Sequence, residues 1–279
     1  MKTFTDIGLL QAYIQTIKTQ SNKIAFIPTM GAFHEGHLSL IKFAKEHYDK
    51  VAVSIFVNPT QFGPNEDFLS YPRTIETDRS LLKSLDVDIL FIPTKSSIYP
   101  DVDTFTTVGI PNLDNIYCGS SRPLFFRGVC SVVLRLFNII TPDYALFGLK
   151  DFQQYTLIKK MVHDLFLPIS IIGRPIIRDS TGLALSSRNS YLNSSQRQDA
   201  SSIFRSLRLA REYFIPSKKC SYKELTELIN THLSPNITLD YCVIVDKDTL
   251  KQVNYPKSGN RILFAGSINR TRLIDNIEL

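Results

Sequence analysis

Short apolar runs alternate, over the first part of the chain, with segments whose apolar residues recur every three or four positions. Wholly apolar runs are typical of strands covered on both faces, and the three- or four-residue spacing is typical of amphipathic helices. The predicted strands span residues 24–27, 51–57, 88–92, 145–148 and 169–173. The predicted helices begin near Gly36 and span residues 74–85, 129–140 and 151–166. This alternation predicts an α/β fold, a Rossmann-like doubly wound parallel sheet.

The pattern changes after residue 175, where a polar loop is followed by two helices and two strands. The helices are expected over residues 196–214 and 221–232, and the strands over residues 241–245 and 261–265. We therefore predict two domains. Residues 1–175 form the Rossmann-like domain, and residues 176–279 form a smaller α+β domain that is expected to act as a lid.

Composition narrows the class of protein. The chain has 279 residues, of which 43% are hydrophobic, enough for a sizeable core. It has no apolar stretch of the roughly 18 to 20 residues needed to cross a membrane, and its first residues do not resemble a signal peptide. We expect a cytoplasmic protein with no membrane partner. The four scattered cysteines are expected to be reduced thiols.

The net charge of +6 leaves two kinds of partner open. Basic residues are spread along the chain without a basic tail or a basic run interleaved with aromatic residues. The surplus therefore fits a nucleic acid, an anionic small substrate or an ordinary solvated surface. Charge alone does not choose among them.

The loop at residues 28–37, with the sequence PTMGAFHEGH, joins a predicted strand to a predicted helix. A helix start offers unpaired N–H groups, and Gly31 and Gly36 have no side chains to obstruct a phosphate. The glycine spacing matches a Walker loop, but His37 and Leu38 stand where that loop needs Lys and then Ser or Thr. The imidazoles of His34 and His37 can instead donate to phosphate oxygens, which indicates nucleotidyl transfer.

Three further segments combine turn residues with polar side chains. Residues 56–63 offer amides and hydroxyls suited to a small hydroxy acid, although a strand-ending turn has the same composition. Residues 147–154 place Lys150 beside a helix start, where it can neutralise a phosphate or remain a solvated lysine. In residues 182–189, Arg188 follows two serines and can grip phosphate oxygens, unless the segment is only a capped loop.

In combination these motifs resemble the pantothenate synthetase family, also called pantoate-β-alanine ligases, which belongs to the nucleotidyltransferases with a His-x-Gly-His element. The resemblance runs through the whole chain. Its motifs are PTMGAFHEGH from Pro28, SIFVNPTQFG from Ser54, YPRT from Tyr71, FNIITPDYALFGLKDFQQ from Phe137, GLALSSRNSYL from Gly182 and TRLIDN from Thr271.

The resemblance implies an ATP- and Mg²⁺-dependent condensation of (R)-pantoate with β-alanine. Pantoate attacks the α-phosphate, pyrophosphate leaves, and β-alanine then displaces AMP from the pantoyl adenylate. A mixed anhydride needs a site that excludes water. The resemblance also implies a homodimer with no nucleic-acid partner, and it places nucleotide and pantoate binding in residues 1–175.

The resemblance also assigns residues by position. The catalytic residues would be His34, His37 as proton donor, Lys150 at the pentacovalent phosphorus, and Arg188. The residues assigned to ATP are Met30, Gly31, Ala32, Phe33, His34, Glu35, Gly36, His37, Gly148, Leu149, Lys150, Asp151, Ile177, Leu185, Ser186, Ser187 and Arg188. Those assigned to pantoate are Met30, Gln61, Val132, Val133 and Gln154, with Gln61 also near β-alanine and Asp78 near magnesium.

Several positions depart from the family pattern. Leu149 stands where the family usually has Glu, Leu185 where it has Met, and Thr181 where it has Asp. Residues 122–126 read Arg-Pro-Leu-Phe-Phe, where family members commonly read Arg-Pro-Gly-His-Phe. Each of the cationic residues assigned to phosphate is present.

Two other functions remain as alternatives. One is a nucleotidyltransferase that adenylylates a phosphorylated acceptor and stops there, so that a stable adenylated product accumulates. The other is a nucleotide- or RNA-binding module without turnover, whose RNA affinity would fall steeply with added salt.

Overall fold

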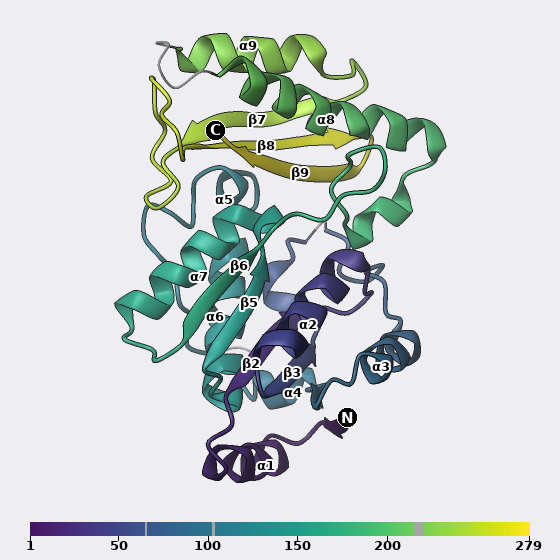
Figure 1. Ribbon diagram of the computed structural model, residues 1–279, viewed down its shortest axis with the longest axis vertical. Helices are drawn as coiled ribbons and strands as arrows, with labels where there is room; N and C mark the ends of the chain where they lie inside the picture. Colours follow the sequence, from purple (N-terminus) through teal and green to yellow (C-terminus); the bar gives the residue numbers. More distant parts are fainter. Residues whose placement is uncertain (65, 102–103, 215–219) are drawn as a thin grey trace. The chain divides into compact units, whose positions relative to one another are not determined.

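The structure, a computed structural model, describes residues 1–64, 66–101, 104–214 and 220–279. The chain divides into two compact units (Figure 1). Unit 1 comprises Met1–Gly148 and Leu157–Arg174, and unit 2 comprises Leu149–Thr156 and Pro175–Leu279. The units change over at residues 174 and 175, next to the predicted boundary, but unit 2 also contains the segment that carries Lys150.

Unit 1 is built on a parallel six-stranded sheet in the order β1-β4-β3-β2-β5-β6. This arrangement confirms the predicted doubly wound fold. The strands are β1 (Lys2–Phe4), β2 (Ile24–Thr29), β3 (Lys50–Ile55), β4 (Ile89–Phe91), β5 (Tyr144–Gly148) and β6 (Ser170–Arg174). The neighbours β2 and β5 lead outward to opposite edges, so their carboxyl ends mark the switch point where such sheets bind ligands.

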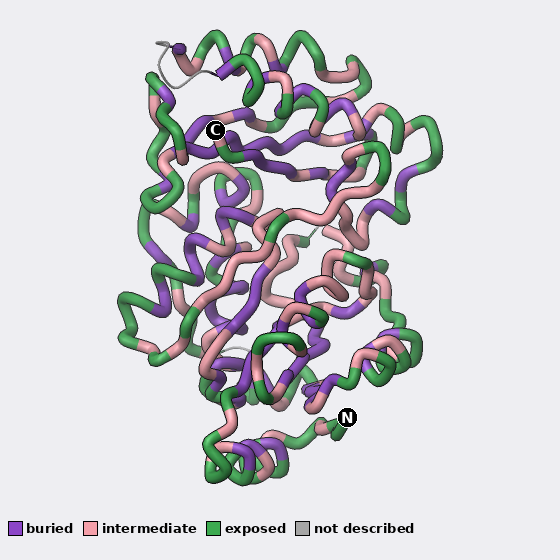
Figure 2. Tube along the Cα trace, in the orientation of Figure 1, coloured by how far each residue is buried: buried purple, intermediate pink, exposed green. Residues whose placement is uncertain are grey.

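Helices cover both faces of this sheet (Figure 1). The side chains of Ala25 and Ile27 in β2 pack with residues of α2, whereas Phe26 lies edge-on to Phe137 of α6. This alternation explains why β2, β3, β4 and β5 are largely apolar and buried, as the purple segments of Figure 2 show, whereas the edge strands β1 and β6 have no buried residue. The helices are α1 (Ile7–Thr19), α2 (Glu35–His47), α3 (Ile75–Ser84), α4 (Lys95–Ile98), α5 (Cys118–Ser121), α6 (Phe125–Ile140) and α7 (Phe152–Asp164), which begins in unit 2.

Helix α1 and the start of helix α6 differ from the sequence prediction. Helix α1 was not predicted, although Asp6 caps it by accepting from the amide of Leu9 and its buried residues Leu10, Ile14 and Ile17 have helical spacing. Helix α6 begins at Phe125, four residues before the predicted start, because Leu124 precedes it with a left-handed φ of 69°. The resemblance leads us to expect Gly at position 124, the residue for which this conformation costs least.

Unit 2 packs two helices against an antiparallel sheet in the order β7-β8-β9. Its elements are α8 (Ser194–Tyr213), α9 (Tyr222–His232), β7 (Thr238–Val245), β8 (Arg261–Ile268) and β9 (Thr271–Glu278). The apolar side chains of one sheet face form a core with both helices. Strand β9 was not predicted as a strand, although its TRLIDN motif was noted. None of the helices in the described ranges is long and apolar enough to cross a membrane.

Candidate active site

The loop after β2 is held in shape by a buried carboxylate. Asp78 of α3 is 1% exposed, and its Oδ2 and Oδ1 accept from the amides of Ala32 at 2.9 Å and Phe33 at 3.0 Å. Gly31 has a φ of 80°, and a Cβ there would lie 2.9 Å from Asp78 Oδ2. Thr29 ties the loop to β3, because its hydroxyl donates to the Ser54 carbonyl at 2.7 Å. The loop conformation therefore requires both the glycine and the carboxylate.

The two histidines form the start of α2. His34 is the N-cap, and its Nδ1 accepts from the amide of Gly36 at 3.1 Å. His37 reaches back, and its Nδ1 accepts from the amide of His34 at 3.4 Å. A neutral imidazole that accepts at Nδ1 carries its proton on Nε2, so each ring is a donor at Nε2. The ring centroids lie 4.1 Å apart.

Gly36 has a steric role in this cap as well. A Cβ at Gly36 would lie 2.7 Å from Cε1 and 2.8 Å from Nδ1 of His34. The absence of a side chain therefore allows the His34 ring to fold over the first turn of α2. The predicted role of Gly36, room for a phosphate, stays a prediction beside this observed one.

Gln61 is oriented by contacts at both ends of its amide. Its Oε1 accepts from Asn58 Nδ2 at 3.1 Å, and its Nε2 lies 3.2 Å from Met30 Sδ. Asn58 is buried and also accepts from the hydroxyl of Tyr99 at 2.9 Å. Burial raises the pKa of Tyr99, so this hydroxyl remains a donor at neutral pH. The structure thus brings together Met30 and Gln61, two residues assigned to pantoate.

Helix α6 supports the turn that carries Gln61. The turn η1 (Pro59–Gln61) packs against Gly128, whose carbonyl accepts from Asn58 Nδ2 at 3.2 Å. Val132 and Val133, assigned to pantoate, are buried one turn further along α6. In the divergent stretch before α6, Arg122 packs over the Phe125 ring at 3.6 Å and donates to Glu66 at 2.6 Å.

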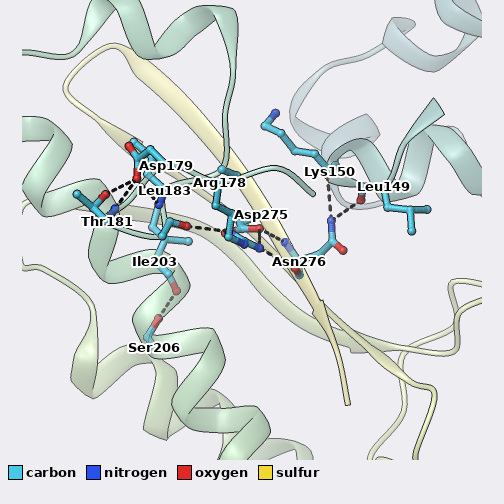
Figure 3. Close-up of polar contacts among 12 residues, drawn as sticks. Leu149, Lys150, Arg178, Asp179, Thr181, Leu183, Ile203, Ser206, Asp275 and Asn276 are labelled. Atoms are coloured by element: carbon cyan, nitrogen blue, oxygen red, sulfur yellow. Dashed lines mark hydrogen bonds and ion pairs between the residues drawn. The ribbon is translucent and has the colours of Figure 1, made fainter. Parts of the chain in front are cut away.

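In unit 2, Lys150 lies in the turn η2 (Leu149–Asp151) just before α7. Its Nζ lies 3.9 Å from Asp151 Oδ2. The carbonyls of Leu149 and Lys150 both accept from Nδ2 of Asn276, at 2.8 and 3.0 Å (Figure 3). Gln154, assigned to pantoate, is half-buried in the first turn of α7. Asn276 of β9 therefore holds in place the turn that carries Lys150, the candidate cation for phosphate.

The remaining residues of unit 2 that were assigned to ATP lie in a hairpin and in the short helix that follows it. Ile177 and Leu185 pair across a tight hairpin, with the Leu185 amide donating to the Ile177 carbonyl at 2.9 Å. Ser186 then caps the short helix η3 (Ser187–Tyr191), and its hydroxyl accepts from the amide of Arg188 at 3.3 Å. Local turn chemistry thus sets the backbone of Ser186, Ser187 and Arg188.

The side chains of the site can be tested for their ability to bind Mg²⁺. Among the described residues, no group of three or more His, Cys, Asp or Glu side chains could hold a metal ion. Asp78, the residue assigned to the magnesium neighbourhood, is buried and accepts from two amides and from Thr74 Oγ1 at 3.2 Å. Mg²⁺ commonly takes only one or two carboxylates and fills its shell with phosphate oxygens and water. The observed contacts of Asp78 fit the loop better than they fit a metal ion.

Fold and site define the class: an α/β protein whose Rossmann-like sheet leads into a helix capped by two histidines. The chain belongs to the pantoate-beta-alanine ligase family, whose model matches residues 2–278. As a member of this family the protein is a ligase.

Individual relatives agree with this family. The pantothenate synthetase of Thermoanaerobacter pseudethanolicus is 46% identical over 274 residues, covering 97% of this chain and 96% of its own. The crystal structure of pantothenate synthetase from Thermus thermophilus matches with a TM-score of 0.93 and 38% identity, covering 100% of this chain and 99% of its own. The Francisella tularensis ligase, complexed with beta-gamma ATP and beta-alanine, matches with a TM-score of 0.81 and 40% identity, covering 100% of this chain and 97% of its own.

Sequence reasoning did not find four residues that shape these loops. Asn58 lies inside the motif SIFVNPTQFG, and Asp275 and Asn276 lie inside TRLIDN, but the motifs alone indicate no role for these three residues. Asp78 was noted for a different role. The signal available for each was a polar residue within an otherwise apolar or periodic segment, which marks a buried group in need of partners.

Proposed function

We propose that the protein joins (R)-pantoate to β-alanine at the expense of ATP, by way of a pantoyl adenylate. In the first step a pantoate carboxylate oxygen bonds to the α-phosphorus and the bond to the β-phosphate oxygen breaks, releasing pyrophosphate. In the second step the β-alanine amine attacks the acyl carbon, AMP leaves, and the amine loses a proton. Membership of the ligase family and the capped histidine pair support this proposal.

The observation that carries the proposal is the fixed orientation of His34 and His37. Nδ1 of each ring accepts a hydrogen bond from a backbone amide. The neutral ring therefore carries its proton on Nε2 and donates from there. Donors held in place before the reaction stabilise charge on phosphate oxygens without reorganisation. We assign both rings as hydrogen-bond donors, through Nε2, to phosphate oxygens. The assignment of His37 as proton donor to the leaving pyrophosphate requires the protonated ring, in which Nδ1 no longer accepts from the His34 amide.

The other assigned residues complete the proposed chemistry. Lys150 stabilises the pentacovalent phosphorus, and Arg188 binds phosphate oxygens as a fork. Gln61 and Gln154 bind the polar groups of pantoate, Val132 and Val133 contact its methyl groups, and Gln61 also serves β-alanine. Nucleotide contacts are proposed for Met30, Gly31, Ala32, Phe33, Glu35, Gly36, Gly148, Leu149, Asp151, Ile177, Leu185, Ser186 and Ser187.

Magnesium enters the proposal as the cation that ATP carries on its phosphates. A hard divalent ion neutralises the phosphate charge that the carboxylate must approach. The prediction that Asp78 lies in its neighbourhood is retained only as an alternative to the loop-holding role. A cytoplasmic homodimer is also proposed, and a sedimenting mass equal to that of one chain would contradict the dimer.

The test is a two-stage release assay. We expect pyrophosphate to appear from ATP and Mg²⁺ only when D-pantoate is present, and AMP and pantothenate to appear only after β-alanine is added. Pyrophosphate release that is indifferent to pantoate would overturn the proposal. A stable adenylate that β-alanine cannot discharge would favour the nucleotidyltransferase alternative, and salt-sensitive RNA binding without turnover would favour the binding module.

Variants of the assigned residues sharpen this test. His37→Ala and Lys150→Ala are each expected to lower kcat for pyrophosphate release by on the order of 10²-fold, the usual cost of removing a preorganised donor. His47→Ala in the same helix and Lys160→Ala in α7 are matched controls, because both side chains are exposed. Equal losses in the controls would remove the support for the assigned roles.

A further inference from the structure

Strand β9 buries two neighbouring polar residues that have no role in the proposed chemistry. Asp275 is 4% exposed and Asn276 is 2% exposed. Successive side chains of a strand point to opposite faces of the sheet. Asp275 lies on the face of Leu273 and Ile277, which belong to the core with α8 and α9, and Asn276 lies on the other face. Buried polar groups require partners, and the two faces supply different ones.

Asn276 fixes the backbone that carries Lys150. Its Nδ2 donates to the carbonyls of Leu149 and Lys150, at 2.8 and 3.0 Å. Its Oδ1 accepts from Nη1 of Arg261 at 2.6 Å. Carbonyls only accept and a guanidinium only donates, so the amide has a single orientation that satisfies all three contacts. Arg261 in turn lies over the ring of Phe152, with its guanidinium carbon 4.3 Å from the ring centroid. Phe152 is the residue that directly follows the turn of Lys150.

Asp275 fixes the hairpin that carries Ile177 and Leu185. Its two oxygens accept from Nη2 and Nη1 of Arg178, at 2.8 and 2.6 Å. Arg178 also donates to the Gly182 carbonyl at 3.1 Å, which closes the tip of the same hairpin. The guanidinium packs over Phe204 of α8 at 3.7 Å. A bidentate pair of this kind sets the angle as well as the distance between its partners.

Figure 3 shows both sets of contacts converging on this strand. We propose that Asp275 and Asn276 are positioning residues for adenylation, Asn276 acting through the turn of Lys150 and Asp275 acting through Arg178 on the Ile177–Leu185 hairpin. The proposal rests on the proposed function, since it assumes that Lys150 and the hairpin act on ATP. A lysine side chain has a long flexible stem, so fixing its backbone narrows the volume that its ammonium samples.

The decisive variant is Asn276→Asp. It keeps the size of the side chain and an acceptor for Arg261. It replaces the donor that faces the two carbonyls with a carboxylate oxygen, which only accepts and which repels them. We expect kcat for pantoate-dependent pyrophosphate release to fall about 10- to 100-fold, the scale of a small misplacement of a reacting group. We expect the KM for pantoate to change less than about 2-fold, because the turn is not assigned to that substrate.

Ile277→Ala is the matched control for stability. Ile277 follows Asn276 in β9 and is buried in the core of unit 2, away from the turn. This variant is expected to lower the midpoint of unfolding at least as much as Asn276→Asp, while kcat changes less than about 2-fold. If Asn276→Asp and Ile277→Ala lose the same stability and also the same kcat, the proposal is overturned.

A double-mutant cycle tests whether Asn276 acts through Lys150. If it does, Asn276→Asp costs less than about 3-fold once Lys150→Ala is present, because the group being positioned is gone. Single-turnover conditions make the slow double variant measurable. Multiplicative losses would show that the two residues act independently and would overturn this part of the proposal.

Arg178→Lys tests the second part. This change keeps a cation beside Asp275 but loses the bidentate geometry and the stacking over Phe204. We expect the KM for ATP to rise about 10-fold with the KM for pantoate unchanged, the result for a hairpin that binds only the nucleotide. Equal changes in the two KM values would overturn it.

Hydrogen exchange separates this proposal from the proposed function. Amides of the turn, residues 149–151, are expected to exchange faster in Asn276→Asp than in Ile277→Ala, whatever reaction the protein catalyses. Unchanged exchange there would refute positioning by Asn276 even if pantoate-dependent turnover is found. If exchange is faster in Asn276→Asp but the unmodified protein shows no pantoate-dependent turnover, only the proposed function is refuted.

Discussion

A single buried carboxylate controls the loop before the histidine pair. Replacing it by Asp78→Asn turns one acceptor into a donor that faces the amides of Ala32 or Phe33. Leaving a buried amide without its acceptor costs about 1–3 kcal/mol, so we expect the loop to loosen. We predict that kcat/KM for ATP falls about 10- to 100-fold, measured as pantoate-dependent pyrophosphate release.

Magnesium titration distinguishes this role of Asp78 from that of a metal ligand. If Asp78 holds the loop, excess Mg²⁺ does not restore the lost rate, whereas a weakened metal site recovers at high Mg²⁺. Asp114→Asn is the control, because Asp114 is also buried but pairs with Arg127. Recovery of the rate at high Mg²⁺ would contradict the loop-holding role and would support a place for Asp78 near the magnesium ion.

At the scale of an element, helix α6 approaches the turn η1 through Gly128. A Cβ at this position would lie 2.2 Å from the carbonyl oxygen of Thr60 and 2.8 Å from the amide nitrogen of Gln61. Both are backbone atoms, so the turn itself must move. We predict that Gly128→Ala destabilises the protein by about 1–3 kcal/mol in urea unfolding, the cost of overpacking. We also predict a higher KM for pantoate, because the turn carries Gln61.

Gly63→Ala provides the comparison for this prediction. Gly63 follows the same turn, but a Cβ there would meet its nearest atom, Cγ of Glu66, at 3.7 Å. Its replacement is expected to change stability by no more than about 0.5 kcal/mol. A Gly128→Ala protein with normal stability and a normal KM would show that α6 and the turn are not in this close contact.

At the scale of the whole molecule, each unit has its own core and two buried cysteines. Cys118 and Cys130 lie in unit 1, and Cys220 and Cys242 lie in unit 2. Burial raises the pKa of Cys130 and of Cys242 to about 12, so these two thiols stay neutral at pH 9. A thiol of ordinary pKa, about 8.5, is mostly ionised and reactive at that pH.

Thiol labelling therefore reports the opening of each unit. At pH 9 without denaturant we predict that Cys130 and Cys242 react far more slowly than a model thiol, because labelling requires opening. In rising urea, we predict that the two cysteines of one unit become reactive together, as read by mass spectrometry of labelled peptides. Labelling of Cys130 at the rate of a model thiol in native buffer would contradict the burial.

The predictable part of the fold followed from local patterns. The apolar runs at residues 24–27 and 145–148 are found in β2 and β5, because a strand buried on both faces is apolar at each position. Helix α1 has a cap and a regular stripe and could have been predicted by the same rules. The early start of α6 could not, because Leu124 is a poor residue for the left-handed conformation that precedes the helix.

The sequence by itself determined the parallel sheet, the helix start near Gly36 and the family, because alternation, helical spacing and motif order depend on residues close together along the chain. Only the tertiary structure decided which polar residues hold those motifs in place. Asp78 reaches a loop 46 residues away, and Asn276 reaches a turn 127 residues away. Such partners are chosen by the packing of distant elements, and the need of a buried polar group for a partner does not say which partner it finds.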